Sequence, residues 1–150
     1  MIPFDRSRLK FLPLSERKNR VFIESAAIDP DSPPPALPTQ TEQAVAEAAS
    51  CIRASRSRGS VVILAFGAHA VKNALGPVII RLIEEGWVTH LATNGAGIIH
   101  DWEFAYQGAS SEDVRENVAR GQFGLWEETG FYINLALLVG AHRGLGYGES

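Results

Sequence analysis

The residues whose types suit ligand chemistry fall in two short stretches rich in glycine and alanine. The first is GAHAVK, residues 67–72. Gly67 and Ala68 would let a ligand approach the backbone closely, and His69 and Lys72 could contact a phosphate or a carboxylate. A solvated turn of small residues would explain the same pattern, so the stretch alone is only a candidate binding loop.

The second stretch is TNGAG, residues 93–97. Asn94 and Gly95 tolerate left-handed backbone conformations, so successive N–H groups, including that of Ala96, could form an anion-binding nest. Thr93 and Asn94 could also bind ribose hydroxyls. The stretch is not GxGxxG, so the standard Rossmann fingerprint is absent. A tight connection between a strand and a helix explains the residues equally well, and spacing alone leaves both interpretations open.

Polar side chains follow directly in HDWE, residues 100–103. In a helix His100 and Glu103 share a face, whereas His100 and Asp101 point in different directions. Either His100 or Asp101 could act as a catalytic general base near the turn. The alternatives are a packed histidine and a first-turn acid that offsets the helix dipole. No fixed spacing of ligand-type side chains predicts a metal site.

Both glycine-bearing stretches follow apolar runs that predict strands. SVVILAF, residues 60–66, is a continuous β-branched run typical of a parallel strand buried on both faces, and WVTHLAT, residues 87–93, predicts a second strand. Between them, Pro77 in a first turn and Gly86 at the end bound an apolar helix. Because ligands bind beyond the carboxyl ends of parallel strands, we expect both turns at the same edge of the sheet.

The first part of the chain differs in composition from the rest. Residues 1–38 hold most of the prolines and predict an irregular arm, in which residues 19–25 could pair as an edge strand. Alternatively, the whole arm packs on a neighbouring subunit. Residues 39–150 predict an α/β nucleotide-binding-like domain, which opens with an alanine-rich helix capped by Thr39 or Thr41.

Helices are also expected after the second strand. Residues 98–108 predict one, Ser110 or Ser111 would cap the next, and residues 125–144 predict the last. The sum is an α/β fold, a parallel sheet with flanking helices. Two strands are few, because such sheets typically have about five or six. We therefore expect an incomplete sheet, in a fragment of a larger domain or in a protein whose sheet is completed elsewhere.

Composition limits which partners and which cellular location are expected. The net charge is −3 with 14 basic and 17 acidic residues, which gives no electrostatic case for nucleic acid or an anionic membrane and leaves a small-molecule substrate. The single cysteine, Cys51, excludes a disulfide framework and a multi-cysteine metal site. With no signal peptide and no apolar run of about 20 residues, a cytoplasmic location is expected. Aromatic residues from Trp87 to Tyr132 suit core or subunit-interface packing.

With these residues in view, the chain resembles the deoxyhypusine synthase family, and more closely its bacterial-type relatives. The matching pieces are FGAHAVKNALGPVIIRLIEEGWV, ATNGAGIIHDWEFAYQGASSEDV and GQFGLWEETGFYINLAL, within residues 61–138. The family has a TGA start to its first loop and a TTAGG-type turn that leads into acidic residues. The resemblance implies that the chain covers the N-terminal half of such a protein.

The resemblance implies a Rossmann-like NAD-binding fold and a homo-oligomer, a dimer or tetramer, with sites at subunit interfaces. True members are NAD-dependent transferases that oxidise spermidine and pass its aminobutyl group to a lysine. Asp101 corresponds to an aspartate of the family motif. The positions that correspond to cofactor contacts are Gly67, Ala68, Thr93, Asn94, Gly95 and Ala96.

Two departures from the family limit what the resemblance implies. Ile99 and His100 stand where the family has an acidic pair, which removes carboxylates suited to polyamine cations. The imine-forming lysine belongs to a C-terminal half that these residues do not include. One hypothesis is a deoxyhypusine synthase-like enzyme that binds NAD or a related nucleotide and catalyses a polyamine- or amino-acid-related transfer or redox reaction. The other is a non-enzymatic assembly or regulatory module.

Overall fold

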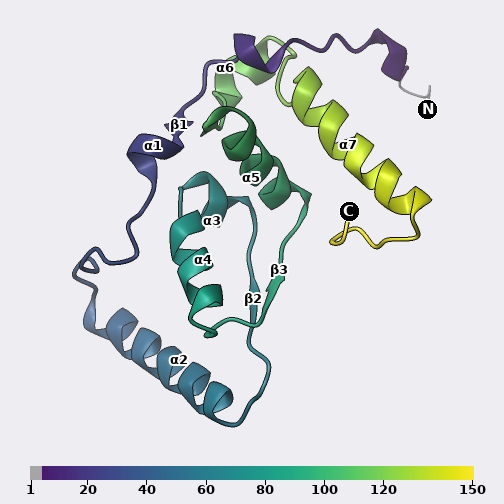
Figure 1. Cartoon of the computed structure of the whole chain (residues 1–150). Helices are drawn as coiled ribbons and strands as arrows, with labels where there is room; N and C mark the ends of the chain where they lie inside the picture. Colours follow the sequence, from purple (N-terminus) through teal and green to yellow (C-terminus); the bar gives the residue numbers. More distant parts are fainter. Residues whose placement is uncertain (1–4) are drawn as a thin grey trace. The chain divides into compact units, whose positions relative to one another are not determined.

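The computed structural model describes residues 5–150 and shows a mixed α/β chain that is mostly helical, with two small sheets (Figure 1). By its contacts the chain divides into two compact units. A continuous unit holds Ile23–Ile98, and a discontinuous unit joins the described residues up to Phe22 with Ile99–Ser150. This division differs from the boundary at residue 38 that composition suggested. Residues 1–4 of the predicted arm lie outside the described residues.

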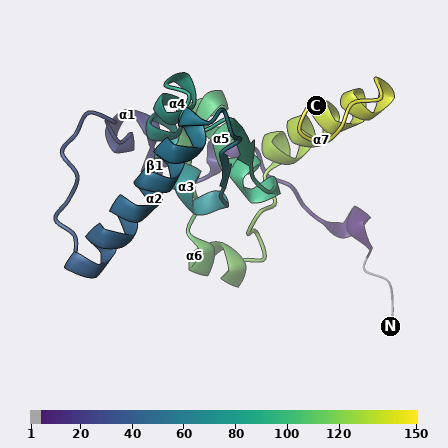
Figure 2. The same cartoon turned by 90° about the horizontal axis from the view of Figure 1, so that it is seen from below.

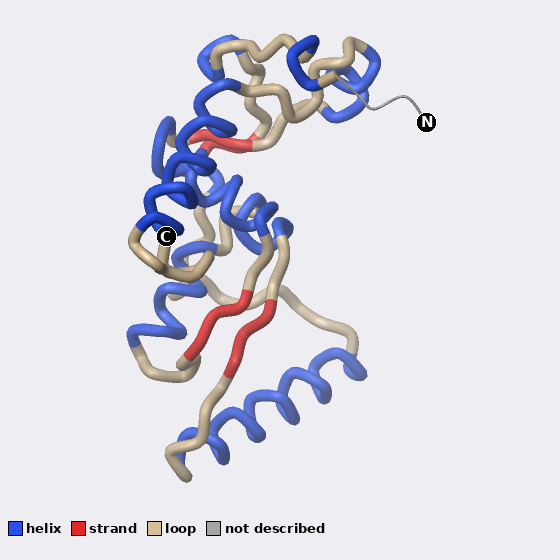
Figure 3. Tube along the Cα trace, turned by 90° about the vertical axis from the view of Figure 1, so that its right-hand side faces the viewer, coloured by secondary structure: helices blue, strands red, loops and turns tan. Residues whose placement is uncertain are grey.

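The continuous unit is built around a parallel pair of strands. Strand β2 (Ile63–Ala65) runs beside β3 (His90–Ala92), with Leu64 opposite Leu91 (Figure 3). Two helices, α3 (Ala68–Lys72) and α4 (Gly76–Glu84), connect the two strands. Both predicted strands and their parallel pairing are confirmed.

Local sequence explains the helices of this unit. Pro77 stands in the first turn of α4, where a missing N–H costs nothing, and Gly86 with φ +73° ends it as predicted. The alanine-rich helix α2 (Thr39–Ser57) is also confirmed, but its predicted cap is wrong. Pro38 occupies the N-cap position, and its carbonyl accepts from the N–H groups of Thr41 and Glu42. Because proline has no side-chain acceptor, no side chain caps the helix.

The predicted burial of β2 on both faces is wrong, and β3 is exposed as well. Ile63 of β2 is 64% exposed and Leu91 of β3 is 46% exposed. In the described part of the chain β2 and β3 pair only with each other, so each strand keeps one edge without a partner. The apolar residues that predicted a sheet covered on both faces therefore belong to a two-stranded sheet that is largely exposed.

The discontinuous unit contains the second sheet. Strand β1 (Val21–Phe22) pairs antiparallel with β4 (Ala109–Ser110), which confirms the predicted edge strand, and α1 (Ile23–Ala26) follows β1 at the start of the other unit. Two short 3-10 helices, Arg6–Arg8 and Leu14–Glu16, precede β1.

The helices of the discontinuous unit are most of α5 (Gly95–Gln107), α6 (Val114–Ala119) and α7 (Glu127–His142). Asp113 caps α6 by accepting from the Glu116 N–H, so the predicted caps Ser110 and Ser111 are wrong. After α7 the chain folds back along the helix, which brings Ser150 against Gly140 (Figure 2). None of the helices described is long and apolar enough to cross a membrane.

Candidate functional site

The carboxyl ends of β2 and β3 bring the two glycine-bearing stretches together. The N–H of Phe66 donates to the carbonyl of Ala92 at 2.9 Å, which continues the pairing past the end of β2. A Cβ atom built on Gly67 would lie 3.6 Å from Nδ2 of Asn94. The expectation that both turns share one edge of the sheet is confirmed. We call residues 66–68 and 93–97 at this edge the carboxyl edge.

Gly67 and Ala68 start a helix directly after β2. Gly67 is the N-cap of α3 with an extended backbone, φ −109° and ψ −164°, and Ala68 is the first helical residue. Both are half-buried, whereas His69 one position later is exposed. A Cβ atom 3.6 Å from the amide of Asn94 would make an ordinary van der Waals contact, so the contact with Asn94 does not by itself require glycine at position 67.

The TNGAG stretch differs from the predicted nest. Helix α5 already begins at Gly95, three residues earlier than expected, and neither Asn94 nor Gly95 has a positive φ. The reason is that Asn94 caps the helix. Its carbonyl accepts from the N–H groups of Gly97 and Ile98 at 2.9 and 3.3 Å, and its Oδ1 accepts from Gly97 at 3.2 Å. A helix start therefore replaces the predicted left-handed nest.

The first turn of α5 keeps donors available for a ligand. Among the described residues no acceptor is recorded for the N–H groups of Gly95 and Ala96, and both residues are exposed, as are Thr93 and Asn94. First-turn N–H groups carry partial positive charge from the helix dipole and bind anions readily. The carboxyl edge can therefore bind an anionic group even without the predicted nest.

Gly97 is a residue of this edge that the sequence did not single out. A Cβ atom at Gly97 would collide with Oγ1 of Thr93, so the close packing of the Thr93 side chain on the helix requires glycine here. The signal was present in the sequence, since a second glycine follows two residues after Gly95. Two glycines near a helix start often mark close backbone packing.

The two predicted catalytic residues lie farther along α5, in the discontinuous unit. His100 is half-buried, and its Nδ1 lies 2.7 Å from Oγ of Ser110. Asp101 is exposed. As predicted, His100 and Glu103 share a helix face, because Glu103 also contacts the hydroxyl of Ser110.

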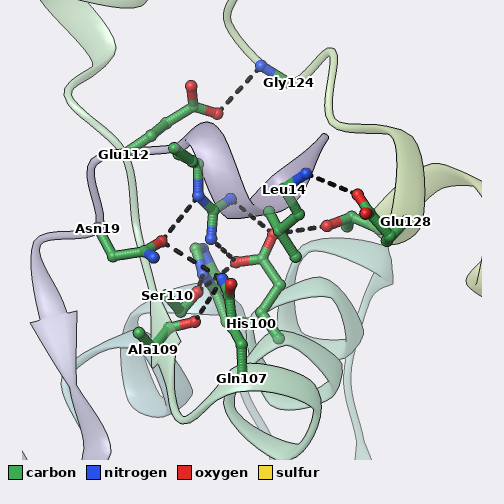
Figure 4. Close-up of polar contacts among 12 residues, drawn as sticks. Leu14, Asn19, His100, Gln107, Ala109, Ser110, Glu112, Gly124 and Glu128 are labelled. Atoms are coloured by element: carbon green, nitrogen blue, oxygen red, sulfur yellow. Dashed lines mark hydrogen bonds and ion pairs between the residues drawn. The ribbon is translucent and has the colours of Figure 1, made fainter. Parts of the chain in front are cut away.

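Glu103 is the centre of a buried polar network, and Figure 4 shows the site, with Asn19, His100 and Ser110 labelled. Its two oxygens accept from Nη1 and Nη2 of Arg17, both at 2.7 Å. The hydroxyls of Ser110 and Thr129 donate to the same carboxylate at 2.5 and 3.0 Å. We call these four residues together with His100 the Glu103 network. Glu103 and Ser110 are at most 1% exposed, and Arg17 is 6% exposed.

The charge of Glu103 is compensated inside the protein. Burial acts to raise the pKa of its carboxyl group, but the hydrogen bonds from Arg17 and Ser110, the positive charge of Arg17 and the Thr129 hydroxyl together hold this pKa below its usual value. Arg17 also donates from Nε to Oδ1 of Asn19 at 2.8 Å, so its guanidinium is well satisfied. The network is thus an ionised pair in a fully hydrogen-bonded site.

Serine, histidine and a carboxylate meet here, but their arrangement is not that of a nucleophilic triad. In a triad the serine hydroxyl gives its proton to histidine and the carboxylate orients that histidine. Here the Ser110 hydroxyl donates to Glu103, and Ser110 is fully buried. We interpret the contacts of Glu103 with Arg17, Ser110 and Thr129 as structural, because they tie the segment around Arg17 to α5, β4 and α7.

The fold and the site together define a mixed α/β chain with a parallel strand pair whose joined carboxyl ends present small residues and helix N–H donors. No group of three or more potential metal ligands is found among the described residues. Comparisons with protein-family models, with curated proteins and with solved structures found no match to this chain.

Proposed function

We propose that this chain is a deoxyhypusine synthase-like protein that binds NAD or a related nucleotide at the carboxyl edge. The observation that carries the proposal is the meeting of Gly67 and Asn94 at the joined ends of two parallel strands. This is the place where open parallel sheets bind nucleotides. The proposed fold is accordingly the Rossmann-like arrangement of that family, of which β2, α3, α4 and β3 would form one part.

Each residue of the carboxyl edge has a role in this proposal. The N–H groups of Gly95 and Ala96 bind a phosphate at the start of α5. Gly67 and Ala68 allow the nucleotide to approach the backbone. Oδ1 of Asn94 already accepts from Gly97, so its Nδ2 is the group that can donate to a ribose hydroxyl or a phosphate, with the exposed residue Thr93 beside it in sequence.

The proposed reaction is a polyamine- or amino-acid-related transfer or redox step in which NAD, when bound, supplies the hydride acceptor. His100 and Asp101 are the candidate bases. Because the Ser110 hydroxyl donates to Glu103, its oxygen accepts from Nδ1–H of His100. We propose a small-molecule substrate and a cytoplasmic location, in line with the acidic charge and the single cysteine.

Titration calorimetry with NAD tests the proposal. The wild-type chain should bind NAD, and Asn94→Ala should weaken binding about tenfold, the effect of losing one or two hydrogen bonds to a ligand. Asn73→Ala is the matched control, because Asn73 is an exposed residue at the other end of α3. No heat of binding up to millimolar NAD would overturn the proposal, as would equal affinities of the Asn94→Ala and Asn73→Ala proteins.

A further inference from the structure

An apolar cleft lies in the continuous unit, near the amino ends of β2 and β3 and away from the carboxyl edge. Its walls come from α2, from β2, from the end of α4 and from the residues that precede β3. Helix α2 lies close to the amino ends of the two strands (Figure 1). The volume of the cleft is about 390 Å³, within the range of roughly 300–1,000 Å³ that is usual for small-molecule sites.

The α2 wall of the cleft is one face of the helix. Arg56 comes four residues after Ile52 and three after Arg53, so the three side chains share this face. Ile52 and Arg53 line the cleft, and Arg56 fixes the helix beside the strands. Nε of Arg56 donates to the carbonyl of Gly86, and its Nη1 donates to that of Ser60 at 3.1 Å. The wall is therefore tied to the loops that precede β3 and β2.

The remaining walls of the cleft are apolar. Val88 is 6% exposed, and Leu64, Leu82 and Trp87 are half-buried. Nε1 of Trp87 donates to Oε2 of Glu85 at 3.0 Å, so the only polar atom of the indole is already occupied. These walls offer a ligand apolar surface and almost no hydrogen bonds, so the group that they bind best is an apolar chain.

A single charge stands among these apolar walls. Arg53 is the one charged residue of the lining, and within the described chain no ion pair or side-chain hydrogen bond is recorded for it. The carboxylate of Glu85, at the end of α4, is already engaged by Trp87 and by Nη1 of Arg81 at 3.5 Å. A guanidinium without a carboxylate complements an anionic ligand group. Charge therefore indicates an acid as the occupant of the cleft.

We propose that this cleft binds a small amphipathic acid, with its apolar chain against Ile52, Leu82 and Val88 and its carboxylate on the guanidinium of Arg53. The proposal goes beyond nucleotide binding and does not depend on it, because the cleft shares no residue with the carboxyl edge. The size of the cleft suits one short-chain molecule, whereas a protein partner typically buries about 1,200–2,000 Å² of surface.

Titration calorimetry of the full 150-residue chain with octanoate tests the proposal. Hexanoate should bind roughly tenfold more weakly than octanoate, because it has two fewer methylene groups to bury. Octanol, which has the same chain length but no charge, should also bind about tenfold more weakly, because it cannot pair with Arg53. Absence of binding up to millimolar octanoate overturns the proposal, and so does an equal affinity for octanoate and octanol.

Variants of the charged residue test the role assigned to Arg53. Arg53→Met should weaken octanoate binding about tenfold and leave octanol binding unchanged, because methionine keeps an apolar side chain but removes the charge. Arg58→Met is the matched control, since Arg58 is an exposed arginine at the C-cap of the same helix and does not line the cleft. Equal octanoate affinities of the two variants overturn the proposal.

A filled cleft tests the place of the apolar chain. Ala49 is half-buried and lines the cleft, so Ala49→Trp should abolish the binding of octanoate and octanol alike. Ala48→Trp is the matched control, because Ala48 is exposed on the same helix outside the lining. Octanoate that binds Ala49→Trp as well as the wild type overturns this site. Circular dichroism verifies that each variant is folded, and the Arg53→Met comparison decides the proposal if Ala49→Trp is not.

Discussion

Removing the Glu103 carboxylate should be among the most destabilising single changes in the discontinuous unit. Glu103→Leu would leave the guanidinium of Arg17 with 6% exposure and only Asn19 as its recorded acceptor. Breaking a buried ion pair by removing one partner typically costs about 3–5 kcal/mol. We expect about 4 kcal/mol for Glu103→Leu, a large part of the 5–15 kcal/mol that usually stabilises a small domain.

Changing the other partner should cost less. In Arg17→Met the carboxylate of Glu103 keeps the hydroxyl donors Ser110 and Thr129, and it can also become neutral by binding a proton. We expect about 3 kcal/mol for this variant. The double variant Arg17→Met with Glu103→Leu leaves no buried charge, and only the hydroxyls of Ser110 and Thr129 lose an acceptor. Its cost should be about 1–2 kcal/mol, so the coupling energy, which is the amount by which the two single costs together exceed the cost of the double variant, should be about 5–6 kcal/mol.

Urea denaturation at pH 7 and a fixed protein concentration measures these values. Tryptophan fluorescence in a Trp87→Phe background reports the discontinuous unit alone, because Trp102 and Trp126 both belong to it. Trp126 is a direct reporter, since Cζ of Arg17 lies 5.7 Å from the centre of its ring. A cost below about 1 kcal/mol for Glu103→Leu, or a coupling energy indistinguishable from zero, would refute the reasoning, because both values are typical of a solvated ion pair.

Two further predictions concern the same unit. The pKa of Glu103 is lowered in the folded chain, so below its usual value of 4.5 the folded state binds fewer protons than the unfolded state. The stability that the ionised Glu103 contributes should therefore be fully present above pH 4.5 and should fall as the pH drops below it. Urea titrations from pH 7 to pH 3 should show a smaller loss of stability in Glu103→Gln than in the wild type. Ser111 has a positive φ of 67°, and its buried hydroxyl has no hydrogen-bond partner among the described residues. Ser111→Gly should therefore stabilise the unit by about 1 kcal/mol in the same assay. A destabilised variant would show that the hydroxyl makes a favourable interaction.

Local pattern predicted the elements of the continuous unit well. The apolar runs around Leu64 and Leu91 form the parallel strands, and Pro77 and Gly86 mark the bounds of α4. Side-chain caps were less predictable, because Asp113 and Pro38 compete with neighbouring serines and threonines for the same helix starts. Propensity alone does not decide between such neighbours.

The strand burial and the Glu103 network required information that local pattern does not contain. A β-branched run such as that around Ile63 predicts a strand, but whether anything covers it depends on the number of strands beside it. Arg17 donates to a carboxylate 86 positions away. Such a pair leaves no periodic signal, so neither Arg17 nor Thr129 could be recognised as part of a buried site from one sequence.

The long separation of these partners also has a consequence for synthesis of the chain. The N–H of Leu14 donates to Glu128, 114 positions later, and at about 5–20 residues per second the ribosome needs roughly 5–25 s to supply that acceptor. Within the continuous unit, by contrast, β2 and β3 can pair as soon as Ala92 has emerged. We expect the continuous unit to fold first on the ribosome. The segment that contains Arg17 then waits with the apolar side chain of Leu14 uncovered, although this side chain is only 1% exposed in the folded chain, and this interval is therefore the time when a nascent chain most needs a chaperone.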